Sequence, residues 1–182
     1  MDLILTTHEL VALALPNGLP RGVSTPVLVR DDLPGDAPAS AGVAPAGDVL
    51  VVDVDPREVP GLPGAARLAA RAAGTVTVRV RIVEVTSGHV RCDVAAAARG
   101  LPAHRLVGLV RGPVEAALQR RLVARGIASD AVRLVPDGDR LEVIADTAAL
   151  LAPAPLPAHL RGLRVTDLRL ADGRARLSIT LP

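Results

Sequence analysis

The sequence predicts an α+β fold in which a curved antiparallel sheet of bulged hairpins packs on one main amphipathic helix. Two stretches, Thr75–Val94 and Leu163–Leu181, alternate apolar and polar residues and then slip in phase by one residue. Alternation is typical of a half-buried strand, and a one-residue slip indicates a β-bulge that bends the sheet. Between these stretches, Pro113–Arg125 carries apolar residues at helical spacing.

The two hairpins follow the same pattern. In the first, valines alternate up to Val80 and resume in the shifted phase at Val83, before a turn at Ser87-Gly88. In the second, the apolar residue after the slip is Leu168 and the turn contains Gly173. Both features recur at an offset of 85 residues, so the same local structure is predicted twice.

Short elements precede the first hairpin. Leu3–Thr6, Val27–Arg30 and Val49–Val54 have the apolar composition of strands. Thr6-Thr7-His8-Glu9 is a capping box, which predicts that a helix begins there. Residues 31–47 are rich in Pro, Ala, Gly and Asp, and we expect them to form a flexible loop.

The main helix is predicted to begin at Pro113, with Gly112 as its cap, and to end at Gly126. After it, Val132–Val135 and Leu141–Ala145 form a further predicted hairpin. Asp146 has the residue type of an N-cap and is expected to begin a short helix that ends at Leu151. The elements as a whole suggest one domain over residues 1–182.

The order of elements suggests an internal pseudo-repeat. Residues 47–94 and 138–179 each contain a strand, a capping aspartate (Asp55 or Asp146), a variable connector and a bulged hairpin. The alternatives are a true duplication and a chance match between valine-rich strands. Two copies are too few for a solenoid.

Composition restricts the classes of function. The chain is 49% hydrophobic and contains no Phe, Tyr or Trp, and its net charge is only +2. The core must therefore consist of Leu, Val and Ala, and aromatic stacking on nucleobases is not available. We expect nucleic acid to be an unlikely partner. The single cysteine, Cys92, forms no internal disulfide and is expected to be a buried structural thiol.

Motifs for catalysis or metal binding do not stand out from background. The four histidines lack metal-ligand spacing, and no serine lies in a nucleophile elbow. Asp53 and Asp55 could hold a cation, but Asp55 is explained more simply as a helix cap. We therefore expect a non-enzymatic protein without a metal or cofactor. With no signal peptide and no transmembrane segment in the sequence, we expect a cytoplasmic location.

The predicted architecture favours binding of a lipid or another apolar ligand in a groove between the curved sheet and the helix. The alternative is a structural or regulatory module with a filled core, which would bind a protein partner or form a homodimer. The ligand-binding candidates lie on the predicted helix. The residues expected to contact the ligand are Arg111, Arg120, Arg121 and Arg125 for an anionic headgroup, and Leu118 and Leu122 for the apolar part. The arginines near the C-terminal end also suit the helix dipole without any ligand.

The C-terminal segment from Leu156 to Gly173 (Leu-Pro-Ala-His-Leu-Arg-Gly-Leu-Arg-Val-Thr-Asp-Leu-Arg-Leu-Ala-Asp-Gly) resembles the closing hairpin of the LmeA-type phospholipid-binding proteins of actinobacteria. The strand that enters a capped helix at Leu5–Leu10 is also similar to that family. The resemblance implies a curved sheet that wraps a helix and holds lipid, as in tubular lipid-binding domains. It covers about the last 45 residues well, and no ligand-contacting residue is carried over from it.

Overall fold

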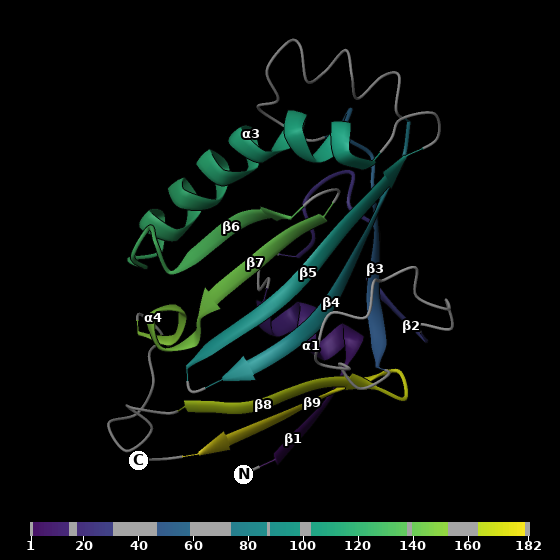
Figure 1. The fold of residues 1–182 in the computed structure, drawn as a ribbon. Coiled ribbons are helices and arrows are strands. Elements are labelled where there is room, and N and C mark those ends of the chain that lie inside the picture. Colours follow the sequence, from purple (N-terminus) through teal and green to yellow (C-terminus); the bar gives the residue numbers. More distant parts are fainter. Residues whose placement is uncertain are drawn as a thin grey trace.

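The computed structural model describes residues 2–14, 18–30, 47–58, 74–86, 88–98, 103–137, 140–152 and 164–180. In these ranges the chain forms nine strands and three helices (Figure 1). The strands are β1 (Asp2–Thr6), β2 (Val27–Arg30), β3 (Asp48–Val54), β4 (Val76–Thr86), β5 (His89–Ala98), β6 (Val132–Asp137), β7 (Arg140–Asp146), β8 (Arg164–Ala171) and β9 (Arg174–Thr180). The helices are α1 (Thr7–Ala14), α3 (Ala103–Ala124) and α4 (Thr147–Leu151).

The strands form two antiparallel sheets. A six-stranded sheet has the order β2-β3-β4-β5-β7-β6, and a three-stranded sheet has the order β1-β9-β8. The first hairpin, β4-β5, lies at the centre of the large sheet. The second hairpin, β8-β9, forms the small sheet together with β1, which is the first strand of the chain (Figure 1).

The predicted fold class is therefore wrong. The described residues are mostly strand, and they form two sheets instead of one curved sheet packed on one main helix. Helix α3 packs mainly against β5, β7 and β6 of the large sheet, while β8 packs against β4 and β3. The physical reason is the long-range pairing of β1 with β9, from Asp2–Ser178 to Thr6–Arg174. Alternation identifies a strand but does not identify its partner.

Both predicted bulged hairpins are confirmed. In β4-β5 the register shifts between Ile82 and Glu84, and in β8-β9 it shifts between Val165 and Asp167. Each hairpin turns at a glycine with a positive φ, which is +93° at Gly88 and +70° in the second turn. The other predicted strands, the capping box and the short helix α4 are also present.

The pseudo-repeat does not extend to the pairing of strands. In the first unit, β3 pairs with its own hairpin through β4. In the second unit, β7 pairs with β5 and β6, and its hairpin lies in the other sheet. The bulge residues also differ in position, because Thr166 lies two residues further from its turn than Val83 does. The two units thus share an order of elements but not a structure. Residues 31–46 of the predicted loop lie outside the described residues.

The predicted start of the main helix is also wrong. Helix α3 runs from Ala103 to Ala124, so Gly112 and Pro113 lie in its interior. Proline in a helix interior removes one hydrogen bond and kinks the helix, whereas proline at the first turn costs little. For this reason the sequence Gly112-Pro113 predicts a helix start, although the structure places it inside the helix. Figure 1 shows that α3 changes direction along its length.

The large sheet has one apolar and one charged face. On the apolar face, one row across β4, β5, β7 and β6 consists of Ile82, Cys92, Val143 and Leu134. The adjacent row on the other face begins with Arg81, Asp93 and Glu142. Strand alternation therefore gathers the charged side chains at the centre of this sheet on one face, where Ile144 and Val135 also lie. We call the first side the apolar face. Its central rows contain Val80, Val94 and Leu141, and then Ile82, Cys92, Val143 and Leu134.

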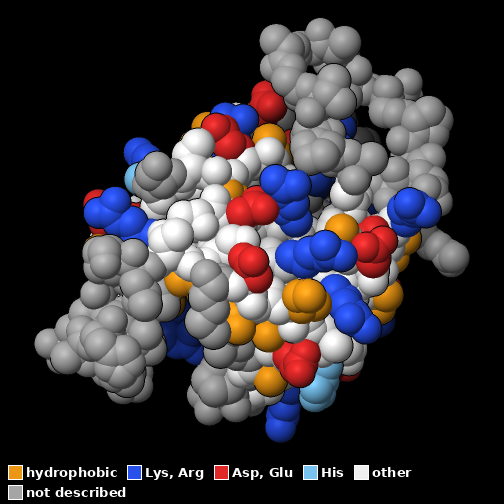
Figure 2. Space-filling view, turned by 90° about the horizontal axis from the view of Figure 1, so that it is seen from below, with side chains coloured by type: hydrophobic (Ala, Val, Ile, Leu, Met, Phe, Trp, Pro, Cys, Tyr) orange, Lys and Arg blue, Asp and Glu red, His pale blue; other side chains and the backbone are white. Residues whose placement is uncertain are grey.

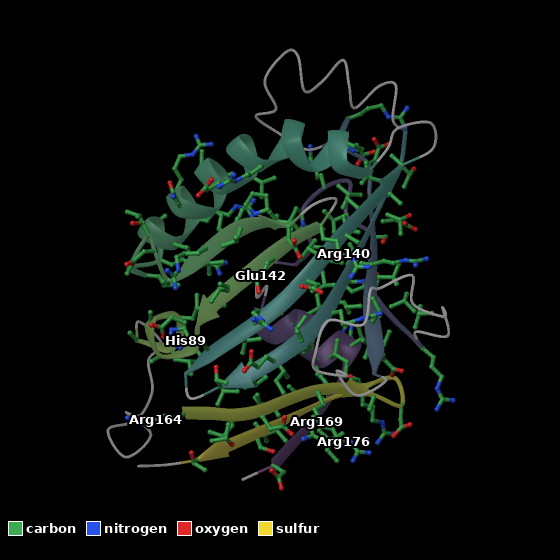
Figure 3. All side chains as sticks on the ribbon, in the orientation of Figure 1. His89, Arg140, Glu142, Arg164, Arg169 and Arg176 are labelled. Atoms are coloured by element: carbon green, nitrogen blue, oxygen red, sulfur yellow. The ribbon has the colours of Figure 1, made fainter. Side chains whose placement is uncertain are left out.

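The charged face is held by ion pairs between neighbouring strands. Arg91 lies 3.4 Å from Glu84 and 3.2 Å from Glu142, and Arg140 lies 3.9 Å from Asp93. Figure 3 labels Glu142 and Arg140 on this sheet. All of these side chains are at least partly exposed to solvent. Exposed ion pairs contribute about 0–1 kcal/mol each. The ion pairs on this face therefore add little to the free energy of unfolding, and they mainly favour this arrangement of neighbouring strands.

The small sheet buries one face and exposes the other. Val165, Leu170 and Ala175 are buried on the inner face. The outer face carries Arg169 and Arg176, and Figure 2, seen from below, shows basic and acidic side chains interleaved on this side of the molecule. The small sheet therefore closes the bottom of the fold with a solvated surface.

One close backbone approach fixes the segment before β2 to the end of β3. Gly22 has a φ of +78°, and a Cβ atom there would lie 2.7 Å from both the Asp55 carbonyl oxygen and the Glu58 Cβ. Gly18 has the same φ of +78°, but a Cβ there would meet nothing within 4 Å. These two glycines separate the effect of backbone strain from the effect of a steric clash.

We predict that Gly18→Ala lowers the free energy of unfolding by about 1 kcal/mol, because only left-handed strain is added. Gly22→Ala should lower it by roughly 2 to 4 kcal/mol, because strain and overpacking add. Urea denaturation of both variants measures the difference. Equal losses at the two positions would show that the approach between Gly22 and Asp55 is not tight.

Candidate ligand-binding site

The centre of the apolar face is the candidate site. Its side chains come from β4, β5 and β7, and the register places Val80, Val94 and Leu141 in one row. The next row contains Ile82, Cys92 and Val143. Alternation in three adjacent strands therefore aligns apolar side chains over a continuous surface, in which cross-strand pairs contact one another.

Helix α3 covers this surface unevenly. Near its C-terminal end, Leu122 on the helix and Leu134 on β6 are buried, at 6% and 7% exposure. Val135, on the opposite face of β6, is 40% exposed, so the covering elements lie on the apolar side. Further along the helix, Leu118 is half-buried and Val114 is 45% exposed. Among the described side chains of α3, burial is therefore greatest near the C-terminal end of the helix.

The rows beyond the buried end stay partly accessible. All six side chains of the two central rows over β4, β5 and β7 are half-buried, not buried. In a close-packed interior, apolar side chains at a sheet centre would be almost fully enclosed. The centre of the apolar face therefore retains surface that an apolar ligand can cover.

The six residues predicted to bind a ligand all lie on α3 or directly after it. Leu122 is buried and Leu118 is half-buried, so both face the protein interior at least in part. Arg111 Nε is shielded from solvent and donates no hydrogen bond to a described residue, although Glu115 Oε2 lies 3.9 Å away. Arg120 Nε donates a hydrogen bond to the Ala116 carbonyl oxygen at 3.2 Å.

Arg121 and Arg125 are exposed, so the structure does not bring the four arginines together around one point. The role of these arginines in headgroup binding stays a prediction. The residues of the apolar face itself were not named as site residues from the sequence. Their alternation was visible, but the register that aligns β4, β5 and β7 was not.

Cys92 lies in the middle of the apolar face, opposite Ile82 on β4 and Val143 on β7. Burial, with a smaller contribution from Asp93, raises the pKa of its thiol from the ordinary value of 9.0 to about 11. Removal from water disfavours the thiolate, which is the reactive form. The expectation of a structural thiol agrees with this environment.

A cavity of about 260 Å³ lies at the end of β5 and β7 and has a polar lining. His89 and Arg133 border it, together with Asp130 and Asp146. The Asp146 carboxylate already accepts hydrogen bonds from the Ala148 and Ala149 backbone N–H groups, as the N-cap of α4. One of the carboxylates that line this cavity, that of Asp146, is therefore already used to cap α4. Among the described residues, no group of three or more His, Cys, Asp or Glu side chains is placed to hold a metal ion.

Comparison with known proteins gives no identification. No protein-family model, no curated protein and no solved structure matches this chain. The resemblance to LmeA-type phospholipid-binding proteins therefore stays a prediction. No helix in the described part of the chain combines the length and the hydropathy needed to cross a bilayer.

We predict that Cys92 reacts with iodoacetamide at pH 8 about a hundredfold more slowly in the folded protein than in urea, because a pKa of about 11 leaves about a hundredfold less thiolate. The rate in the folded protein should rise with pH up to about 11. Mass spectrometry of the alkylated protein measures the rate. Equal rates in the folded and unfolded protein would contradict the burial of this thiol.

Proposed function

We propose that the protein binds a lipid or another apolar ligand on the apolar face, without catalysing a reaction. The observation that carries this proposal is the half-buried centre of that face, beside the buried Leu122 and Leu134 near the end of α3. Covering apolar surface stabilises a complex by about 25 cal/mol per Å² removed from water. A ligand there would complete the core.

The chemistry of the surface supports low specificity. The lining is made of valine, leucine, isoleucine and one cysteine, with no aromatic ring to select a flat ligand. Contacts of this kind depend on shape and contact area and not on direction. Acyl chains fit such a surface, because they are flexible and carry no polar group that needs a partner.

The position of a headgroup is part of the proposal. Arg111 is the best placed of the four predicted arginines, because its Nε is shielded from solvent without a hydrogen bond among the described residues. A shielded guanidinium N–H gains most from an oxyanion ligand such as a phosphate or carboxylate. Glu115, 3.9 Å away, would compete for it. A cytoplasmic location is also proposed, supported by the single free cysteine.

The position of Cys92 allows a direct test. We predict that oleate slows alkylation of Cys92 at pH 9.5 several-fold, because the ligand covers the apolar face around the thiol. The matched control carries Cys92→Ser together with Val135→Cys, which moves the only thiol to the opposite, exposed face of the same sheet. Oleate should leave the rate of that variant unchanged.

Equal slowing of both proteins would indicate non-specific micelle binding, and no slowing of either would contradict the proposal. An additional variant, Arg111→Gln, tests the contact with the ligand headgroup separately from the contacts with its acyl chain. It should weaken protection by oleate several-fold but leave protection by the uncharged oleyl alcohol unchanged.

A second candidate function, a protein interaction module, is favoured by the exposed edge of the large sheet. Strand β2 is an edge strand, and its Val27 and Val29 are 56% and 47% exposed. Exposed apolar edges pair readily with other strands. If this function operates, light scattering should show a mass that rises with concentration, and Val29→Lys should abolish the rise. A constant monomer mass at all concentrations would contradict it.

A further inference from the structure

Strand β1 forms one edge of the small sheet. Within the described part of the chain it pairs only with β9, and the order β1-β9-β8 leaves no strand on its other side. In Figure 1, β1 lies beyond β9, on the side away from β8 and the large sheet. Ile4, at the centre of β1, is 57% exposed, so the middle of this edge strand is accessible to solvent.

The backbone groups that face the outer edge of β1 can be identified from hydrogen bonds. In an antiparallel sheet, alternate residues of a strand direct both backbone groups to the same neighbouring strand. The Ser178 carbonyl oxygen on β9 faces β8, because it accepts a hydrogen bond from Thr166 Oγ1 at 3.1 Å. The backbone groups of Arg176, two residues earlier, therefore face β8 as well. Ile4 is the partner of Arg176 on β1, so its N–H and C=O groups point away from β9.

A hydrogen bond on β1 itself gives the same orientation. The Thr6 backbone N–H donates to Glu9 Oε2 at 2.7 Å, within the capping box of α1. Ile4, two residues earlier, directs its backbone groups to the same side as Thr6. Leu3 and Leu5 then exchange the hydrogen bonds with β9. The Ile4 N–H and C=O groups are therefore the central donor and acceptor of the outer edge, which ends at Thr6 because the capping bond already uses its N–H.

The side chains of β1 are complementary to a second copy of the same strand. Antiparallel pairing about a two-fold axis at Ile4 places this side chain opposite its own copy on the outer face of the sheet. On the inner face, Leu3 then lies opposite the partner's Leu5, and both leucines are half-buried in the single copy. Cross-strand apolar pairs of this kind stabilise a sheet.

Charges on the outer face match in the same register. Asp2 would lie opposite the partner's Thr6, and the neighbour of Thr6 in that row of the sheet is Arg174. Neighbouring strands are about 4.8 Å apart, so the Cα atoms of Asp2 and the partner's Arg174 would be about 10 Å apart, within reach of an extended arginine side chain. The two-fold axis repeats this attraction on the other side of Ile4.

Two other sheet edges carry features that oppose strand pairing. Strand β8 contains the bulge at Thr166 and packs against β4. Strand β6 contains Pro136, which has no backbone N–H to donate. Bulges and prolines are common devices that protect an edge strand from association. Strand β1 has neither of them, and an apolar side chain is exposed at its centre.

We propose that β1 pairs with β1 of a second copy of this chain, in antiparallel orientation about a two-fold axis at Ile4. The two three-stranded sheets would join in one continuous sheet with the order β8-β9-β1-β1-β9-β8. Two hydrogen bonds at the axis would link the N–H and C=O groups of Ile4 in both copies. The proposal goes beyond ligand binding and does not depend on it, because the apolar face belongs to the large sheet.

Disulfide cross-linking of the full chain tests this register. In the variant Ile4→Cys the two new thiols would lie on residues about 5.5 Å apart at Cα, which a disulfide can bridge. The matched control is Asp2→Cys on the same face of the same strand, where the two copies would be about 14 Å apart along the strands. We expect a covalent dimer from Ile4→Cys only, detected by non-reducing electrophoresis after mild oxidation. The unmodified protein, which contains Cys92, should stay uncross-linked.

A proline substitution tests the backbone hydrogen bonds. Ile4→Pro removes an N–H that faces the outer edge, so it should weaken association at least tenfold and leave the free energy of unfolding nearly unchanged. Leu5→Pro is the matched variant, because it removes an N–H that bonds to β9 and should destabilise the fold. Sedimentation equilibrium measures association, and urea denaturation of the dilute protein measures stability.

Several results would overturn the proposal. They are a monomer mass at every concentration, association of Ile4→Pro as strong as that of the unmodified protein, and cross-linking of Asp2→Cys as fast as that of Ile4→Cys. A loss of stability in Ile4→Pro as large as in Leu5→Pro would also overturn it, because the Ile4 N–H would then bond within one copy. Loss of association in Val29→Lys but not in Ile4→Pro would assign the contact to β2 instead.

Discussion

The structure depends on the separation of side chains that strand alternation produces in β4, β5 and β7. Their register places Val80, Val94 and Leu141 in one row and Arg81, Asp93 and Glu142 in the next, on opposite faces. One face must therefore be covered, and the other can remain in water. Helix α3 packs on the half of the sheet formed by β5, β7 and β6, and Leu122 is buried there. The half-buried centre of the apolar face is the observation on which the proposed ligand binding rests.

A second constraint is the unequal length of β3 and β4. Strand β4 has 11 residues and β3 has 7, and their pairing ends at Val80. The bulge at Val83 lies in the part of β4 that β3 does not reach. A bulge increases local twist and bends the strand. The end of β4 thus lies against the small sheet, where Asp48 accepts a 2.6 Å hydrogen bond from the Gly173 backbone N–H.

Local features could be predicted from the sequence because their causes are local. The bulged hairpins, the Thr6–Glu9 capping box and the Asp146 cap depend on residues a few positions apart. The fold class could not be predicted, because it depends on the pairing of β1 with β9 across almost the whole chain. The start of α3 could not be predicted for another reason. Gly-Pro is compatible both with the start of a helix and with the interior of a kinked helix, and Gly112-Pro113 lies in the interior of α3. The predicted site residues include Leu122, which is buried, and their role in ligand binding stays a prediction, whereas the residues of the apolar face could not be aligned without the register.

The central claim is that the apolar face is completed by a ligand. Native mass spectrometry of the gently purified protein tests it most directly, because the mass of the chain is known from its sequence. The account predicts a population with a bound mass in the range of lipids, which is lost after organic extraction while the protein remains folded. A clean mass of the chain alone, with no uptake of added fatty acid, would contradict the account and favour a core that is complete without a ligand.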